Sequence, residues 1–349
     1  MITRTRVVVL AFCATFALAA PGSGQVLLYS LFERYIDSLR QQTGIPGMSA
    51  VIVKNGQVEW ERGFGHQDIE RNVMAAPDTP YPVGDLTQTV TTVLLGTCAE
   101  QGALDIDQPM SQWVGDFPSP SETVRQVLAH AEGGQFRYDP ARFASLTAVA
   151  QGCNPKPFRA NVADSVLERL GMTGSVPGQD LGTPGAPARE LFDAQRLNRY
   201  EAVLERVALP YRVDRNLRAT RSDFRPKGIN AAEGLVSTAR DLARFDSALD
   251  DAVLLRPETL GIAWSQSNFT GSPLPTGLGW FVQNYHGERL IWHFSYVADA
   301  YSALILKLPA RRVTLIMLAN SDGLSTGANL EQGDVTASPF VKIFLRLFV

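Results

Sequence analysis

The chain has 349 residues, of which 45% are hydrophobic and 19% are charged. This composition is typical of a globular protein with a large core and excludes a disordered or low-complexity chain. The formal net charge of −3 argues against a nucleic-acid partner.

The first residues have the pattern of a secretory signal. Basic Arg4 and Arg6 precede an apolar stretch over residues 7–20, and Pro-Gly-Ser-Gly follows. The apolar stretch is too short to cross a bilayer, so we predict a signal peptide over residues 1–24 and no membrane span. Its removal takes away those two arginines and no acid, so 30 of the 32 basic residues and all 35 acidic residues remain. The mature protein is therefore expected to be secreted or periplasmic.

Cysteine and histidine offer few candidate ligands. Cys98 and Cys153 remain in the mature chain. An oxidising compartment would allow them to pair, but each lies in an apolar helical context, which favours buried free thiols. We predict no metal site and no cofactor, because metal-ligand spacing is absent from the four histidines, His66, His130, His286 and His293.

Apolar periodicity predicts the first elements of the mature chain. Residues 28–39 carry apolar side chains at helical spacing, and Gly44 follows as a stop signal. Two strands are expected over residues 49–54 and 57–62, because they flank Asn55-Gly56, a strong signal for a two-residue hairpin.

The rest of the chain divides into a helical middle and a strand-rich end. Residues 86–222 alternate helical stretches with Pro/Gly loops and contain no convincing strand. Further strands are predicted over residues 279–285, 289–293, 301–307 and 312–318, and a closing apolar helix is predicted over residues 341–349.

This order predicts an α/β (α+β) fold, in which an antiparallel sheet built from both chain ends is flanked by helices. A mostly helical subdomain is inserted between those ends. We expect a single domain over residues 25–349, because no internal repeat is present. Its sheet subdomain covers about residues 25–85 and 223–349, and its helical subdomain covers about residues 86–222.

A series of local motifs follows the same order along the chain. It comprises residues 45–53 (IPGMSAVIV), 63–65 (GFG), 81–84 (YPVG), 100–109 (EQGALDIDQP), 124–130 (VRQVLAH), 234–245 (GLVSTARDLARF) and 318–320 (LAN). These motifs are spread over nearly the whole mature chain, from residue 45 to residue 320. The series resembles the serine β-lactamase-related family of class C β-lactamases, D-alanyl-D-alanine carboxypeptidases and penicillin-binding proteins. The resemblance implies a β-lactamase/transpeptidase-like fold.

The resemblance also implies a mechanism. Family members place a serine nucleophile and its lysine base in an S-x-x-K motif at a helix start. A Y-x-N element supplies a second proton-transfer group, and an H-x-G or K-T-G strand positions the substrate. Backbone N–H groups near the serine and on that strand form the oxyanion hole.

The chain departs from this pattern at the positions that carry the chemistry. Asp85 stands where the family has serine, and Gln88 stands where it has lysine. Gln88 cannot accept a proton at neutral pH. Tyr138 keeps the phenol of Y-x-N, and His293 keeps the first residue of H-x-G. Ser295 replaces the glycine whose small size lets a substrate lie against the strand edge.

Each of these residues also has a structural interpretation. Asp85 and Gln88 fit a helix capping box, which we favour over a nucleophilic aspartate because no base is left to assist it. A hydrogen-bonded structural role is favoured for His293, and a role in the wall of a leftover pocket for Tyr138. The family positions Asp85, Gln88, Tyr138 and His293 are therefore not assigned as catalytic. Candidate binding residues are Tyr138, His293 and Ser295.

Three functional hypotheses follow. The first is an exported, catalytically inactive family member, or pseudoenzyme, with a cleft for a peptide, a cell-wall fragment or a protein partner. The second is a hydrolase of weak or altered activity on esters or amides that uses Asp85 with Tyr138 or His293. The third is a scaffold or interaction protein whose cleft is irrelevant. The direction of the Asp85 carboxylate separates the hydrolase from the other two. An open pocket with Asp85, Tyr138 and His293 within about 4 Å would favour catalysis, whereas a carboxylate that turns back onto the helix amides leaves nothing to attack a carbonyl.

Overall fold

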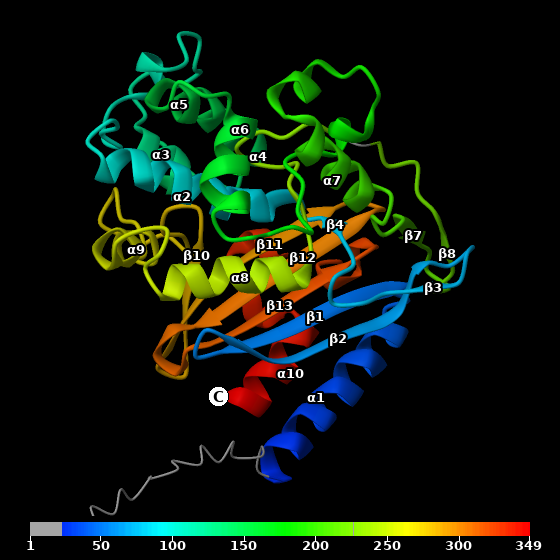
Figure 1. Ribbon diagram of the computed structural model, residues 1–349. Coiled ribbons are helices and arrows are strands. Elements are labelled where there is room, and N and C mark those ends of the chain that lie inside the picture. The colour runs from blue at the N-terminus through cyan, green and yellow to red at the C-terminus, as the bar shows by residue number, and fades with distance from the viewer. Residues whose placement is uncertain (1–22, 226) are drawn as a thin grey trace, which may run out of the picture.

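The computed structural model describes residues 23–225 and 227–349 (Figure 1). The predicted signal peptide lies outside the described residues except for residues 23 and 24, which begin the first helix. No helix within the described ranges has the length and apolarity that a bilayer crossing requires.

Seven antiparallel strands form the main sheet in the order β10-β11-β12-β13-β1-β2-β3. The N-terminal strand β1 pairs with the C-terminal strand β13, with Ala50 opposite Met317. This pairing confirms the predicted antiparallel sheet built from both chain ends (Figure 1). The strands are β1 Gly47–Lys54, β2 Gln57–Asp68, β3 Val73–Met74, β10 Phe281–Tyr285, β11 Glu288–Val297, β12 Tyr301–Leu308 and β13 Val313–Ala319.

The predicted hairpin joins β1 to β2. Asn55 and Gly56 both have positive φ angles, 54° and 76°, as a type I′ turn requires. β2 continues six residues beyond the predicted end at Arg62. Gly63 lies within this extension, where a Cβ would come within 2.0 Å of the Ala75 carbonyl oxygen. Glycine interrupts the side-chain alternation that marks a strand in the sequence, which explains the early predicted end.

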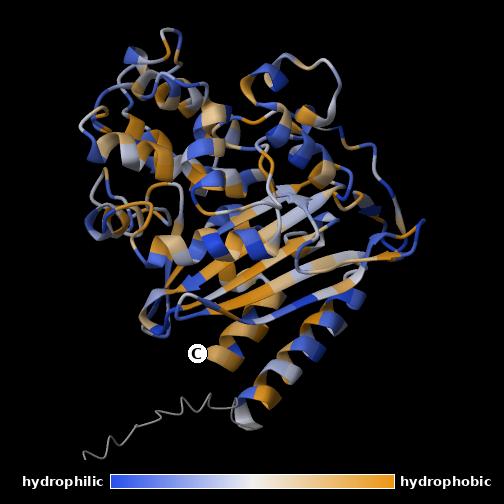
Figure 2. Ribbon diagram, in the orientation of Figure 1, coloured by the Kyte–Doolittle hydropathy of each residue, from blue (hydrophilic) through white to orange (hydrophobic). Residues whose placement is uncertain are grey.

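Helices cover both faces of the sheet. The first helix, α1 (Ser23–Gln42), and the last, α10 (Pro339–Phe348), pack together on one face. Helix α8 (Ala239–Asp250) lies on the other face, below the helical part of the molecule (Figure 1). Figure 2 shows that α10 and much of the centre of the sheet are apolar. The sheet is therefore the middle layer, with a hydrophobic core on each side.

The helical part lies above α8. Its helices, together with the neighbouring α9, are α2 Thr87–Glu100, α3 Val124–Leu128, α4 Pro140–Phe143, α5 Leu146–Cys153, α6 Phe158–Val162, α7 Ala194–Leu204 and α9 Pro257–Ala263. The prediction that residues 86–222 contain no strand is wrong. Two small hairpins occur there, but their strands are too short to show a side-chain alternation. They are β5 Ala131–Glu132 with β6 Gln135–Phe136, and β7 Tyr211–Val213 with β8 Ala219–Arg221. A further two-stranded pair joins β4 Tyr81–Pro82 to β9 Val236–Ser237.

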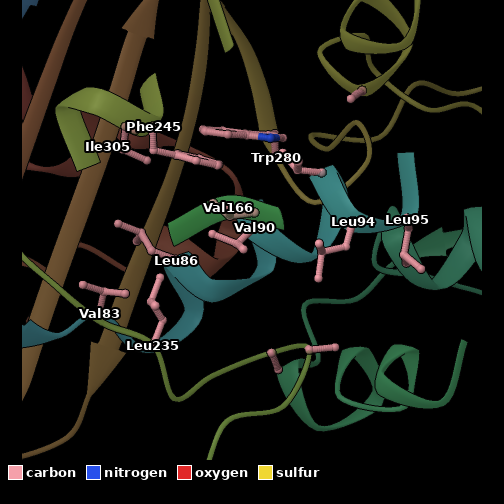
Figure 3. Close-up of a cluster of buried hydrophobic side chains, with 14 of the residues drawn as sticks. Val83, Leu86, Val90, Leu94, Leu95, Val166, Leu235, Phe245, Trp280 and Ile305 are labelled. Carbon is pink, nitrogen blue, oxygen red and sulfur yellow. The ribbon is translucent and has the colours of Figure 1, made fainter. Parts of the chain in front are cut away.

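Helix α2 is the central helix of the core between the sheet and the helical part. Val90 and Leu94 pack in a cluster that also contains Ile305 of the sheet and Val166 of the helical part (Figure 3). The start of α2 is thus fixed relative to both parts of the fold.

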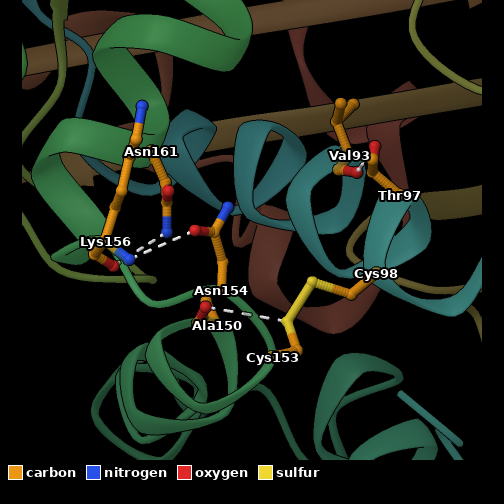
Figure 4. The surroundings of a disulfide bond; sticks show 8 residues. All are labelled: Val93, Thr97, Cys98, Ala150, Cys153, Asn154, Lys156 and Asn161. Carbon is orange, nitrogen blue, oxygen red and sulfur yellow. Dashed lines mark hydrogen bonds between the residues drawn. A yellow bond between two sulfur atoms is a disulfide. The ribbon is translucent and has the colours of Figure 1, made fainter. Parts of the chain in front are cut away.

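A disulfide bond also holds α2. Cys98 near its end is bonded to Cys153 at the end of α5, and the two Cα atoms are 6.1 Å apart (Figure 4). The preference for free thiols was wrong. Both cysteines do lie in apolar helical surroundings, but the packing of α5 against α2 brings them together, and a sequence separation of 55 residues gives no sign of that contact.

Candidate functional site

The Asp85 carboxylate does not cap helix α2. Asp85 lies in a 3-10 turn, Gly84–Leu86, and α2 begins only at Thr87. Neither the turn nor the helix has a side-chain cap, so the capping-box prediction is wrong. The intervening turn shifts Asp85 away from the N-cap position, and its Oδ2 instead accepts a hydrogen bond from the Tyr138 hydroxyl at 2.9 Å.

Tyr138 is held by the turn that follows β6. Asp139 caps α4 by accepting from the Arg142 N–H, and Pro140 occupies the first turn of that helix. The Tyr138 ring packs between the rings of His130 and Phe294, with centroid distances of 4.6 and 5.3 Å. Proline at the third position of the family's Y-x-N element thus starts a helix and fixes the direction of the phenol.

Gln88 is fully buried, with its side-chain oxygen between two histidines. His130 Nδ1 accepts from the Asp139 N–H at 3.2 Å, so the neutral ring carries its proton on Nε2 and donates to Gln88 Oε1 at 2.8 Å. His293 Nδ1 donates to the Phe294 carbonyl at 2.8 Å, and its Nε2 lies 3.3 Å from the same Gln88 oxygen. The Gln88 amide nitrogen has no hydrogen-bond partner among the described residues.

Burial sets the protonation of these groups. Desolvation raises the pKa of Asp85 to about 7, although the Tyr138 hydrogen bond opposes the shift. Desolvation lowers the pKa of His293 to about 4 and holds the pKa of His130 well below its ordinary value. Burial and the neighbouring Asp85 raise the pKa of Tyr138. Near neutral pH both rings are therefore neutral, the phenol is protonated, and Asp85 is partly ionised.

The Ser295 hydroxyl is hydrogen-bonded to a backbone N–H group beside this cluster. It lies on β11, 1% exposed, and its Oγ accepts the Asp85 N–H at 3.2 Å. Gly84 permits this approach, because a Cβ at that position would lie 2.1 Å from the Ser295 oxygen. The serine hydroxyl therefore takes the N–H group that, by the family resemblance, belongs to the oxyanion hole.

Asp85 and Tyr138 open onto a pocket of about 450 Å³. His293, Gln88 and Ser295 are buried behind it and do not line it. The lining residues are Asp85, Tyr138, Pro140, Phe294, Tyr296, Ser325, Thr326, Gly327, Asn329 and Glu331. The structure thus brings all five predicted site residues into one cluster but exposes only two of them to a ligand.

Two groups of site residues were not predicted from the sequence. One is His130, whose hydrogen bond to Gln88 has no local sequence signal. The loop over residues 325–331 contributes half of the pocket wall, and its only sequence signal is a polar, glycine-containing segment after a buried strand. Within the described ranges, no group of three His, Cys, Asp or Glu side chains is placed to hold a metal ion.

The comparison with known proteins gives the family. Residues 32–333 match the beta-lactamase family, and the chain belongs to it. Among solved structures, the fold is similar to D-alanine carboxypeptidase AmpC from Burkholderia cenocepacia. The TM-score is 0.70 at 18% identity, over 92% of this chain and 99% of that one. It is also similar to the octameric penicillin-binding protein homologue from Pyrococcus abyssi, with a TM-score of 0.70 at 21% identity, over 84% of this chain and 74% of that one.

Sequence relatives match over a shorter range. Protein flp of Staphylococcus aureus is 32% identical over 107 residues, which are 29% of this chain and 22% of flp. The match therefore covers about a fifth of that relative.

Proposed function

We propose that this chain is a catalytically inactive member of the beta-lactamase family that binds a ligand in the pocket of Asp85 and Tyr138. The observation that carries the proposal is the hydrogen bond from the Asp85 N–H to the Ser295 hydroxyl. It fills the oxyanion-hole donor from within the protein, so a substrate carbonyl would have to displace a buried hydroxyl to use it.

The other two requirements of acyl transfer are also unmet. A carboxylate stands in place of the hydroxyl nucleophile. The base position holds Gln88, whose oxygen accepts from His130. His293 does not replace the base, because it is buried behind the pocket and bonded to a backbone carbonyl. Nucleophile, base and oxyanion donor are thus lost together, whereas the pocket has the size of a small-molecule site.

Export is part of the proposal. The N-terminal pattern of a signal peptide supports it. The disulfide between Cys98 and Cys153 supports it independently, because such bonds persist mainly in oxidising compartments. We also propose that residues 25–349 fold as one domain, since one hydrophobic cluster includes residues of both the sheet and the helical part.

The direct test is covalent labelling of the purified mature protein with a fluorescent penicillin, followed by intact mass. We expect no adduct under conditions in which an active family member is fully labelled. An adduct that survives denaturation, and that Asp85→Asn abolishes, would contradict the proposal. The same labelling on Tyr138→Phe would show whether the phenol assists any such reaction.

One observation favours a second candidate, a hydrolase of altered mechanism. Asp85 lies at the pocket with a pKa of about 7, which is suitable for a general base that activates water. Steady-state assays on aryl esters and aryl amides, with Asp85→Asn as the matched variant, separate the two functions. Turnover that depends on Asp85 and falls below pH 7 would favour the hydrolase.

A further inference from the structure

The pocket wall carries negative charge and no positive charge. Among the described residues, Asp85 and Glu331 are the only charged residues of this wall, and no lysine, arginine or histidine lines it. Within the described residues, no basic nitrogen lies within 4.0 Å of the Asp85 carboxylate. Among more distant charges, Glu233 raises the pKa of Asp85 and Lys227 lowers it, and these two residues form an ion pair with each other at 3.0 Å. A site for an anionic ligand would need the opposite arrangement.

The Asp85 carboxylate is available for a further donor. Tyr138 occupies Oδ2, and the other oxygen has no hydrogen-bond partner among the described residues. Two aromatic side chains of the pocket wall, Tyr138 and Phe294, pack on each other with ring centroids 5.3 Å apart. Tyr296 also lines the pocket and is 47% exposed.

We infer that the pocket binds the ammonium group of a small organic amine, with Asp85 as its counter-ion and Tyr138, Phe294 and Tyr296 as its aromatic wall. An ammonium group donates to carboxylate oxygens and is attracted to the faces of aromatic rings. The rim of the pocket adds Ser325, Thr326 and Asn329, which offer neutral acceptors, and the exposed Glu331. This inference rests on the proposed binding function and specifies the chemical class of its ligand.

The test compares three probes of similar size and different charge: benzylamine, benzyl alcohol and benzoate. Dissociation constants are measured by protein-observed NMR near neutral pH, and the intact mass of each sample is recorded. We expect benzylamine to bind at least about tenfold more tightly than the other two, since an ion-paired hydrogen bond is worth about one to two powers of ten.

Three variants locate the binding. Asp85→Asn keeps an acceptor for Tyr138 and removes the charge, and it should weaken benzylamine binding about tenfold. Glu331→Gln, at the exposed rim, should weaken it about two- to threefold. Glu205→Gln removes an exposed acid that does not line the pocket and should have no effect.

Each outcome has one meaning. Binding of benzoate as tight as that of benzylamine, no saturable binding of benzylamine, or an unchanged constant in Asp85→Asn overturns the inference. A covalent adduct in the fluorescent-penicillin labelling described under the proposed function overturns that function instead, so the two failures are distinguishable.

Discussion

Ser295 provides the sharpest test of the proposed inactivity of the site. Asp85→Ser with Gln88→Lys restores the nucleophile and the base implied by the family motif, but the Ser295 hydroxyl still occupies the N–H of residue 85. Adding Ser295→Gly frees that donor. Because removal of one oxyanion donor typically costs 10²–10³ in rate, about 3–4 kcal/mol, the triple variant should be acylated about 10²–10³ times faster than the double variant.

The assay is the rate of labelling by a fluorescent penicillin, followed by intact mass and by peptide mapping of the modified residue. Ser302→Gly in the double-variant background is the matched control, since it also removes a buried strand hydroxyl, one that bonds to the Ser321 carbonyl. Equal rates for the double and triple variants would refute the reasoning, as would a comparable gain from the Ser302 control.

The remaining predictions concern stability. The pKa of Asp85 is raised by folding, so its contribution is favourable below the unfolded pKa and is lost as pH rises to about 7. The free energy of unfolding of Asp85→Asn, measured in urea relative to that of the natural protein, should therefore rise by about 3 kcal/mol from pH 5 to pH 8. A difference that does not change with pH would contradict this. Replacing Cys98 and Cys153 by alanine should lower the free energy of unfolding by about 4 kcal/mol, and a reductant should lower that of the natural protein by the same amount. An unfolding midpoint that neither change affects would count against the disulfide bond. Gly84→Ala, with its Cβ 2.1 Å from Ser295 Oγ and a φ of 48°, should destabilise by about 2–4 kcal/mol. Adding Ser295→Gly to Gly84→Ala should recover only the part of this loss that comes from the clash with Ser295 Oγ. Additive losses in the double-mutant cycle of these two substitutions would therefore disprove the contact.

The fold was predictable from the sequence because its signals are local. The Asn55-Gly56 turn and the apolar runs of the C-terminal strands specify the sheet without reference to distant residues. The disulfide was not predictable, because it depends on the packing of two helices whose cysteines are 55 residues apart.

The site was predictable only as a set of positions. The family motifs identified Asp85, Gln88, Tyr138, His293 and Ser295, and the structure places them in one cluster. Their contacts were not predictable, because Asp-x-x-Gln at a helix start reads equally well as a cap. A single 3-10 turn before α2 directs the carboxylate to a phenol instead, and no sequence pattern marks that turn.

The proposed loss of the nucleophile and the charge of the pocket have one origin. Asp85 lies just before α2, where the helix dipole favours a negative charge. In a catalytic site, the same end of the helix would stabilise the negative charge that develops on a substrate. Here the protein supplies that charge itself. A second carboxylate about 5 Å from an ionised Asp85 would be repelled by about 3 kcal/mol at an effective dielectric constant of about 20. The aspartate that takes the place of the hydroxyl nucleophile in the proposed function therefore also disfavours anionic ligands and favours the cationic ligands inferred above.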